Sequence, residues 1–190
     1  MLLRHVQHDD LAALREGFEH LSPLSRYHRF NGVVRALSDD MLHFFVGADG
    51  TDHVAIVATS IPVAGAVPRG LGVARFIRDG HTSASAEFAI TVADEMKHEG
   101  LGGILANALV RAARERGILH FRGIIAHDNR PIHLLLAELG PLNEDMEGPD
   151  SLFDVALASP ASVRGSGASL AMVPGHALPT PNHDSRSSSE

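Results

Sequence analysis

The stretch "SAEFAITVADEMKHEGLGGILANALVRAARERG", from Ser85 to Gly117, contains the pattern that decides the fold. Its beginning alternates in polarity as a strand does, and its second half repeats apolar residues at helical spacing. Gly100, Gly102 and Gly103 separate the two, so we expect a helix from about Gly103 to Arg116, followed by a glycine suited to its C-cap. The sequence therefore predicts a strand, a glycine-rich loop and a helix in direct succession.

A glycine-rich loop before a helix favours anion binding, because the first helical N–H groups are unpaired and no Cβ blocks the backbone. Lys97 and His98 stand beside the glycines, which is typical of a pyrophosphate site. A Walker A loop would need Lys-Ser or Lys-Thr where Ile104 and Leu105 stand, and a Rossmann fingerprint would need glycine at Leu105. Both nucleotide motifs are excluded, which leaves another phosphate ligand or a turn that only reverses the chain.

The rest of the chain alternates between helical and strand patterns without an internal repeat. We predict strand, two helices, three strands, helix, strand, helix and strand, which makes a mixed α/β (α+β) sheet rather than a doubly wound one. The predicted segments are a strand at 2–6, helices beginning near Asp10 and around Tyr27 to Val34, strands from His53, Gly70 and Ser85, the helix after the glycines, a strand from Ile118, a helix between Asn129 and Gly140, and a strand at 151–158.

Composition limits the class of protein. The 190 residues suffice for one domain, the net charge is −7, and there is no cysteine. An acidic chain is a poor general binder of nucleic acid and suits cationic partners such as amines. No apolar run is long enough for a membrane span, so we expect a soluble, cytoplasmic protein. Residues 159–190 are rich in Ser, Pro and Gly, which predicts a low-complexity tail after a domain at 1–158.

The central motif resembles that of the GCN5-related N-acetyltransferase superfamily, and the resemblance covers most of Leu3 to Ala158. It implies a mostly antiparallel sheet flanked by helices, with a V-shaped splay between two central parallel strands. It also implies acetyl-CoA as co-substrate, with its pyrophosphate on the glycine loop and its pantetheine arm along the preceding strand. The shorter stretch "LSPLSRYHRF", from Leu21 to Phe30, is similar to bacterial protein lysine acetyltransferases.

The resemblance assigns residues to the cofactor. Lys97 stands where the family usually has Gln or Arg, Asn129 would begin the helix beneath the cofactor, and the family's tyrosine general acid has Leu136 in its place. The expected acetyl-CoA-binding residues are Phe88, Ile90, Val92, Lys97, His98, Glu99, Gly100, Leu101, Gly102, Gly103 and Asn129.

Glu87 is the candidate general base, at the position where family members often carry a glutamate. Alternation places it with Ala89 and Thr91 on one face of its strand. A carboxylate there can accept the proton that an amine must lose before it attacks a thioester, and partial burial would raise its pKa toward a useful value. An oxyanion donor is expected from a strand N–H near Ile90. The alternative is a solvated carboxylate or a structural ion pair.

These features predict an N-acetyltransferase that moves an acetyl group from acetyl-CoA to a primary amine by direct transfer. The acceptor is left open between a small molecule and a protein lysine, and a homodimer is also left open. A non-catalytic acyl-CoA-binding sensor is the alternative, because the usual tyrosine is missing. The 13 histidines show no His-Glu-x-x-His arrangement, so no metal is expected. Neither nucleic acid nor a membrane is expected as a partner.

Overall fold

The computed structural model describes residues 1–61 and 68–157. The predicted low-complexity tail at 159–190 and the predicted domain end at 158 lie outside these residues. No helix in the described ranges has both the length and the apolar character needed to cross a bilayer.

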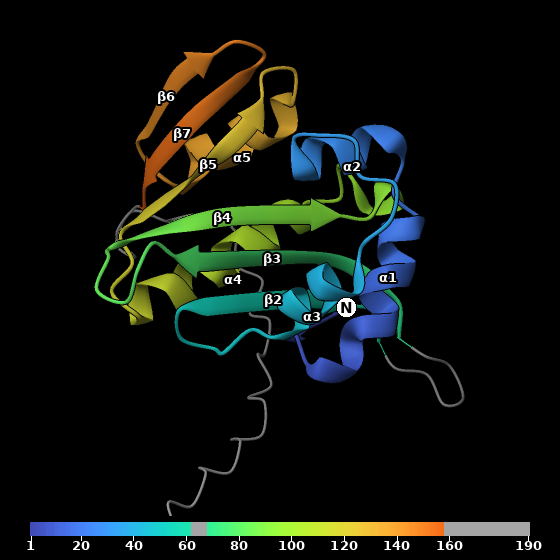
Figure 1. The fold of residues 1–190 in the computed structure, drawn as a ribbon. Helices are drawn as coiled ribbons and strands as arrows, with labels where there is room; N and C mark the ends of the chain where they lie inside the picture. The colour runs from blue at the N-terminus through green and yellow to red at the C-terminus, as the bar shows by residue number, and fades with distance from the viewer. Residues whose placement is uncertain (62–67, 158–190) are drawn as a thin grey trace, which may run out of the picture.

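One seven-stranded sheet organises the fold, with the strand order β1-β2-β3-β4-β5-β7-β6 (Figure 1). Neighbouring strands are antiparallel except for the central pair β4 and β5, which run parallel. The strands are β1 (Leu2–His5), β2 (His53–Thr59), β3 (Gly70–Arg78), β4 (Ser85–Val92), β5 (His120–Ala126), β6 (Leu142–Glu147) and β7 (Asp150–Ala156). The predicted mixed, mostly antiparallel sheet with two central parallel strands is confirmed.

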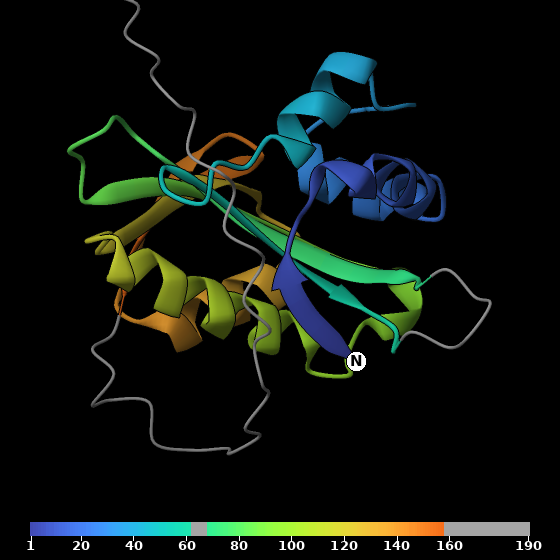
Figure 2. The same cartoon turned by 90° about the horizontal axis from the view of Figure 1, so that it is seen from below.

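Helices cover both faces of the sheet (Figure 2). One face carries α4 (Leu101–Glu115) and α5 (Arg130–Leu139), and a large apolar core lies beneath α4. The other face carries α1 (Leu11–Glu19), α2 (Pro23–Phe30) and α3 (Asp39–Val46), over two smaller clusters. The alternation of β4 follows from this arrangement, because Phe88 packs in the core beneath α4 whereas Glu87 is exposed on the opposite face.

Two elements differ from the sequence prediction. The expected single helix through Val34 is wrong: α2 ends at Phe30 because Asn31 adopts a left-handed conformation with φ 45°. A separate helix, α3, begins after Ser38, whose side chain accepts a hydrogen bond from the Met41 N–H at 3.2 Å. Strand β6 was not predicted, because its sequence "LNEDME" is charged and it is a strand only through pairing with β7.

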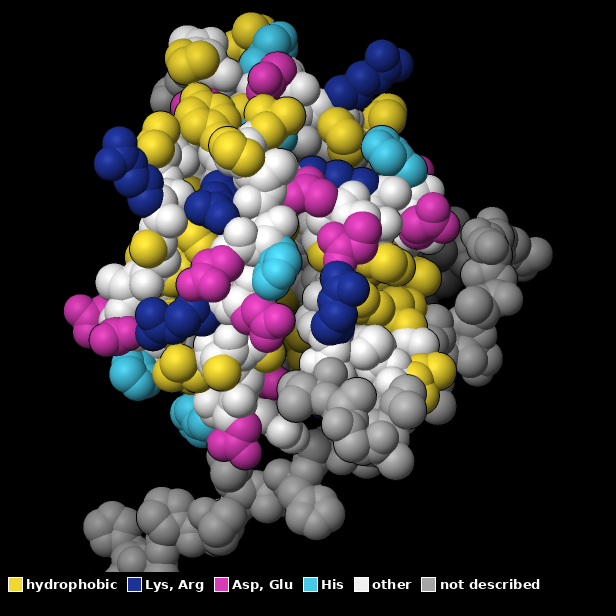
Figure 3. Space-filling model, turned by 90° about the vertical axis from the view of Figure 1, so that its right-hand side faces the viewer, with side chains coloured by type: hydrophobic (Ala, Val, Ile, Leu, Met, Phe, Trp, Pro, Cys, Tyr) yellow, Lys and Arg dark blue, Asp and Glu magenta, His cyan; other side chains and the backbone are white. Residues whose placement is uncertain are grey.

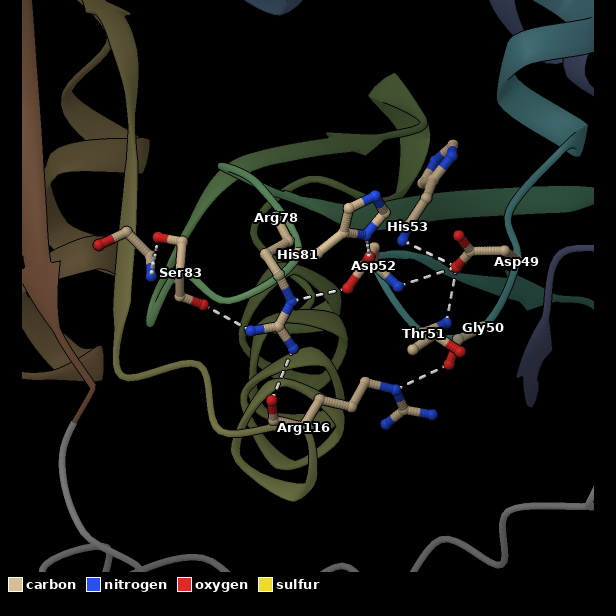
Figure 4. Close-up of polar contacts among 10 residues, drawn as sticks. Asp49, Gly50, Thr51, Asp52, His53, Arg78, His81, Ser83 and Arg116 are labelled. Atoms are coloured by element: carbon tan, nitrogen blue, oxygen red, sulfur yellow. Dashed lines mark hydrogen bonds and ion pairs between the residues drawn. The ribbon is translucent and has the colours of Figure 1, made fainter.

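A polar network fastens the end of the sheet opposite to the glycine loop (Figure 4). The Arg78 guanidinium donates to Asp52 at 2.7 Å, to the Ser83 carbonyl at 2.5 Å and to the Arg116 carbonyl at 2.6 Å. Arg116 in turn donates to the Gly50 carbonyl at 2.7 Å. The C-terminal end of α4 is thereby tied to the turns that flank β2, β3 and β4, which fixes the helix relative to the sheet.

Candidate functional site

The central feature of the site is the point where β4 and β5 separate. The two strands pair only from Ser85 to Glu87 on β4 and from His120 to Arg122 on β5. A Cβ on the next residue, Gly123, would lie 2.7 Å from the Phe153 ring, so any larger residue at this vertex would force that buried ring to shift. Beyond it β4 continues to Val92 with no partner strand on its β5 side. The sheet is therefore splayed where the resemblance implied.

The unpaired part of β4 turns backbone hydrogen-bonding groups toward the splay. The Ala93 N–H donates to the Leu71 carbonyl at 2.9 Å, and the Ser85 carbonyl accepts from the Asp79 N–H at 3.0 Å. Odd-numbered residues of this strand thus bond to β3, and alternation directs the N–H and C=O groups of the even-numbered ones toward β5. These even-numbered residues include Ile90 and Val92, which have no strand opposite them. An extended ligand can pair with this edge as an additional strand would.

The glycine loop leads from β4 into α4 with an unusual backbone. His98 has φ 66° and Gly100 has φ 77°, so left-handed residues lie close together immediately before the helix. Alternation of this kind gathers successive N–H groups into a concave anion site. In the described part of the chain, none of the N–H groups of residues 98–103 donates to a protein acceptor. The loop thus offers several donors at the positive end of a helix.

The helix begins earlier than the sequence indicated. We expected Gly102 and Gly103 to precede it, but α4 starts at Leu101, with Gly100 at its N-cap. Gly102 and Gly103 therefore lie in the first helical turn, and only Gly100 of the three has a positive φ. A Cβ on Gly100 or Gly103 would meet no atom within 4 Å, so this surface of the loop is open.

Asp94 joins this loop to α2. Its carboxylate accepts from Lys97 Nζ at 2.5 Å, from Ser25 Oγ at 2.6 Å and from the Ser22 N–H at 2.7 Å. Burial alone would raise the pKa of Asp94, but these donors outweigh it and lower the pKa from 3.8 to about 2. The Lys97 ammonium is accordingly directed at Asp94 and the start of α2. Its role here is to hold the loop, and sequence reasoning did not identify Asp94.

The other end of α2 reaches β5. The Asn31 side-chain amide donates to the Ile124 carbonyl at 2.9 Å, and His28 Nε2 lies 3.1 Å from Asp128 Oδ1. With its first turn bound to Asp94, α2 therefore crosses from the glycine loop to the far side of the splay (Figure 1). It closes one side of the space between β4 and β5.

Glu87 lies at the vertex of the splay and lines a cavity of about 260 Å³. The expected alternation is observed, since Glu87 and Ala89 both face this cavity. The expectation of partial burial is wrong, because the residue is exposed. Sequence reasoning also missed two arginines that line the same cavity, Arg29 on α2 and Arg75 on β3. The available signal was the sequence "VARFI", which places Arg75 at an otherwise apolar strand position.

The second predicted motif lies on α5. Asn129 is at the N-cap position, as expected, but its side chain makes no capping hydrogen bond and its amide is not committed to the helix. Leu136 is completely buried, with 0% of its surface exposed. Leu136, the residue expected at the family's tyrosine position, therefore supplies no hydroxyl group and does not reach the surface.

The side chains around the site bear on metal binding and on surface charge. Within residues 1–61 and 68–157, no three His, Asp or Glu side chains are grouped closely enough to hold a metal ion. Figure 3 shows the side of the molecule that carries α1, α2 and the C-terminal end of β4, with basic, acidic and histidine side chains interspersed on it. Recognition at the site therefore depends on local groups rather than on one broad charged face.

Several known proteins are similar to this chain in sequence and in fold. No model of a protein family matches the chain. Over 138 residues it is 31% identical to acetyltransferase Pat of Mycolicibacterium smegmatis, a match that covers 73% of this chain and 40% of that protein. Its structure matches the GNAT domain of S. lividans PAT with a TM-score of 0.72 and 24% identity, covering 82% and 89% of the two chains. The chain belongs to the GCN5-related N-acetyltransferase (GNAT) superfamily.

Within this superfamily, the chain lies near the bacterial protein acetyltransferases. A more distant GNAT structure, an acetyltransferase from Salmonella typhimurium with its cofactor acetyl-CoA, shares the fold with a TM-score of 0.60 and 19% identity, covering 84% of this chain and 95% of that one. The chain spans less than half of the mycobacterial relative, 40% of its length. The resemblance inferred from the central motif is thus confirmed at the level of superfamily and fold.

Proposed function

We propose that the protein is an acetyl-CoA-dependent N-acetyltransferase that acts by direct transfer to a primary amine. The observation that carries this proposal is the continuous path formed by the splay, the free edge of β4 and the glycine loop. The path combines an extended backbone edge with an anion site at its end, which suits a long ligand with a pyrophosphate group. The acetyltransferase relatives support the same reaction.

The residues along this path fit the cofactor. The N–H groups of residues 98–103 would bind the pyrophosphate, with Gly100 allowing close approach. The backbone groups of Ile90 and Val92 would pair with the pantetheine arm, and the uncommitted amide of Asn129 lies at the start of α5 across the splay. Phe88 would contribute through its backbone at the vertex. Lys97 would act by fixing the loop through Asp94.

The proposed chemistry uses few protein groups. Acetyl-CoA supplies the thioester, and Glu87, directly or through a water, takes the proton that the acceptor ammonium must lose. The amine nitrogen then forms a bond to the acyl carbon, the carbon–sulfur bond breaks, and the products are an amide and a CoA thiolate that takes up a proton. A thiol with a pKa of roughly 8.5 leaves readily as its anion. The reaction therefore tolerates Leu136 in place of a tyrosine acid.

A second candidate function is a non-catalytic acyl-CoA sensor. Leu136 favours it, because a buried apolar side chain cannot donate a proton to the leaving thiolate. Two measurements separate the functions. Acetyl-CoA should raise the melting temperature, while ATP and NAD should not, since neither carries an arm that pairs with β4. Thiol release should then accompany incubation with a panel of amines. Equal stabilisation by all three ligands would contradict the cofactor assignment, and tight binding of acetyl-CoA without thiol release would favour the sensor.

A further inference from the structure

The cavity beside Glu87 is lined by two arginines that the transfer chemistry does not require. Arg75 is buried, with 4% of its surface exposed, and its Cζ lies 4.3 Å from the centroid of the Phe45 ring. The Cζ of Arg29 lies 5.7 Å from the same centroid and 4.9 Å from that of Phe30. Two cations thus share one aromatic ring at the wall of a cavity of about 260 Å³.

These two guanidinium groups have no carboxylate within ion-pair distance in the described part of the chain. Arg75 donates to the Phe45 carbonyl at 3.3 Å and contacts His53 Nε2 at 3.2 Å. Burial and, to a smaller extent, the positive charge of Arg29 together lower the pKa of Arg75 to about 9. Buried cations of like charge are costly, and an anion placed beside them relieves that cost.

Glu87 faces the same cavity, so cationic and anionic protein groups line one space. Burial lowers the pKa of Arg29, and the nearby Glu87 carboxylate partly offsets this. An acceptor whose amine approaches Glu87 would place its remaining atoms toward the two guanidinium groups. A lone lysine side chain would bring only a positive charge to that region. The volume of about 260 Å³ is also below the roughly 300–1,000 Å³ of pockets for drug-sized ligands.

We propose that the acceptor is a small amine that also carries a carboxylate, with the carboxylate held by Arg29 and Arg75 and the amine directed to Glu87. This inference rests on the proposed acyl transfer and narrows its acceptor class. The planar fork of arginine matches a carboxylate with two parallel hydrogen bonds. The Phe30 ring stacks against the Arg29 guanidinium group and the Phe45 ring against that of Arg75, which holds both groups in place.

The test compares three probes of one length: 5-aminopentanoate, pentanoate and pentylamine. Binding is measured by calorimetry without acetyl-CoA, and acylation by thiol release with it. We expect pentanoate and 5-aminopentanoate to bind, pentylamine to bind at least roughly 10-fold more weakly, and 5-aminopentanoate to be the better substrate in kcat/KM. Equal kcat/KM for pentylamine and 5-aminopentanoate, or faster acylation of a lysine peptide, would overturn the proposal.

Variants locate the anion site. Arg29→Gln should weaken binding of both carboxylates by roughly 10- to 100-fold, the loss expected for a charge-assisted pair. The control Arg35→Gln removes the same charge from an exposed nearby residue and should leave binding unchanged. Unchanged carboxylate affinity in Arg29→Gln, with native melting behaviour, would overturn the site. Because the binding arm needs no acetyl-CoA, failure of acyl transfer alone is distinguished from failure of the anion site.

Discussion

Replacing Asp94 by asparagine tests the junction between α2 and the glycine loop. The pKa of this carboxyl is lowered from 3.8 to about 2 by Lys97, Ser25 and the Ser22 N–H, against the opposing effect of burial. At about 1.36 kcal/mol per pKa unit, that difference sets an upper limit near 2.4 kcal/mol on its contribution to the free energy of unfolding at pH 7. The side chain is 31% exposed, so solvent screening brings the expected loss to about 1–2 kcal/mol.

The pH dependence gives the sharper test. Because the folded pKa lies below the unfolded one, this stabilisation is complete above about pH 5 and declines as the pH falls through 4 toward 2. Urea unfolding of the parent and Asp94→Asn should therefore differ most at pH 7 and progressively less toward pH 3. The control Asp79→Asn changes an exposed carboxylate that has no hydrogen-bond partner among the described side chains, and it should cost little. An Asp94→Asn cost that is equal at pH 7 and pH 3, or no greater than that of the control, would refute the reasoning.

Two further predictions concern the reaction and the loop. Glu87→Gln should lower turnover on the order of 100-fold at neutral pH, with little change in acetyl-CoA affinity and a smaller loss as the pH approaches the amine pKa; an unaltered rate would remove Glu87 from the mechanism. Gly100→Val and Gly117→Val place a side chain at opposite ends of α4, at φ +77° and +74° with open space around each, so both should lose about 1–2 kcal/mol of stability. Calorimetry should show that Gly100→Val alone binds acetyl-CoA more weakly, by at least roughly 10-fold. Equal acetyl-CoA affinity of the two variants would mean that the loop only reverses the chain and does not bind the cofactor.

Local sequence patterns were sufficient to predict several features of the fold and of the candidate site. The alternation around Glu87 predicted that Glu87 and Phe88 lie on opposite faces of β4, because successive residues of a strand point to opposite faces. The glycines after Lys97 predicted the loop and the helix, since only glycine adopts the left-handed conformation of Gly100 without strain. The order of elements and the central motif were enough to predict the superfamily, which the relatives confirm.

Other features depend on contacts between residues far apart in the chain. Strand β6 is charged and forms only because β7 offers it hydrogen bonds. Helix α2 bridges the splay through contacts with Asp94 on one side and with Ile124 and Asp128 on the other. The exposure of Glu87 depends on how the helices cover the sheet. Arg29 and Arg75 are 46 positions apart, and no periodicity relates them. Tertiary packing alone brings them to one aromatic ring beside Glu87, because charge and burial at a cavity depend on neighbours that local sequence does not encode.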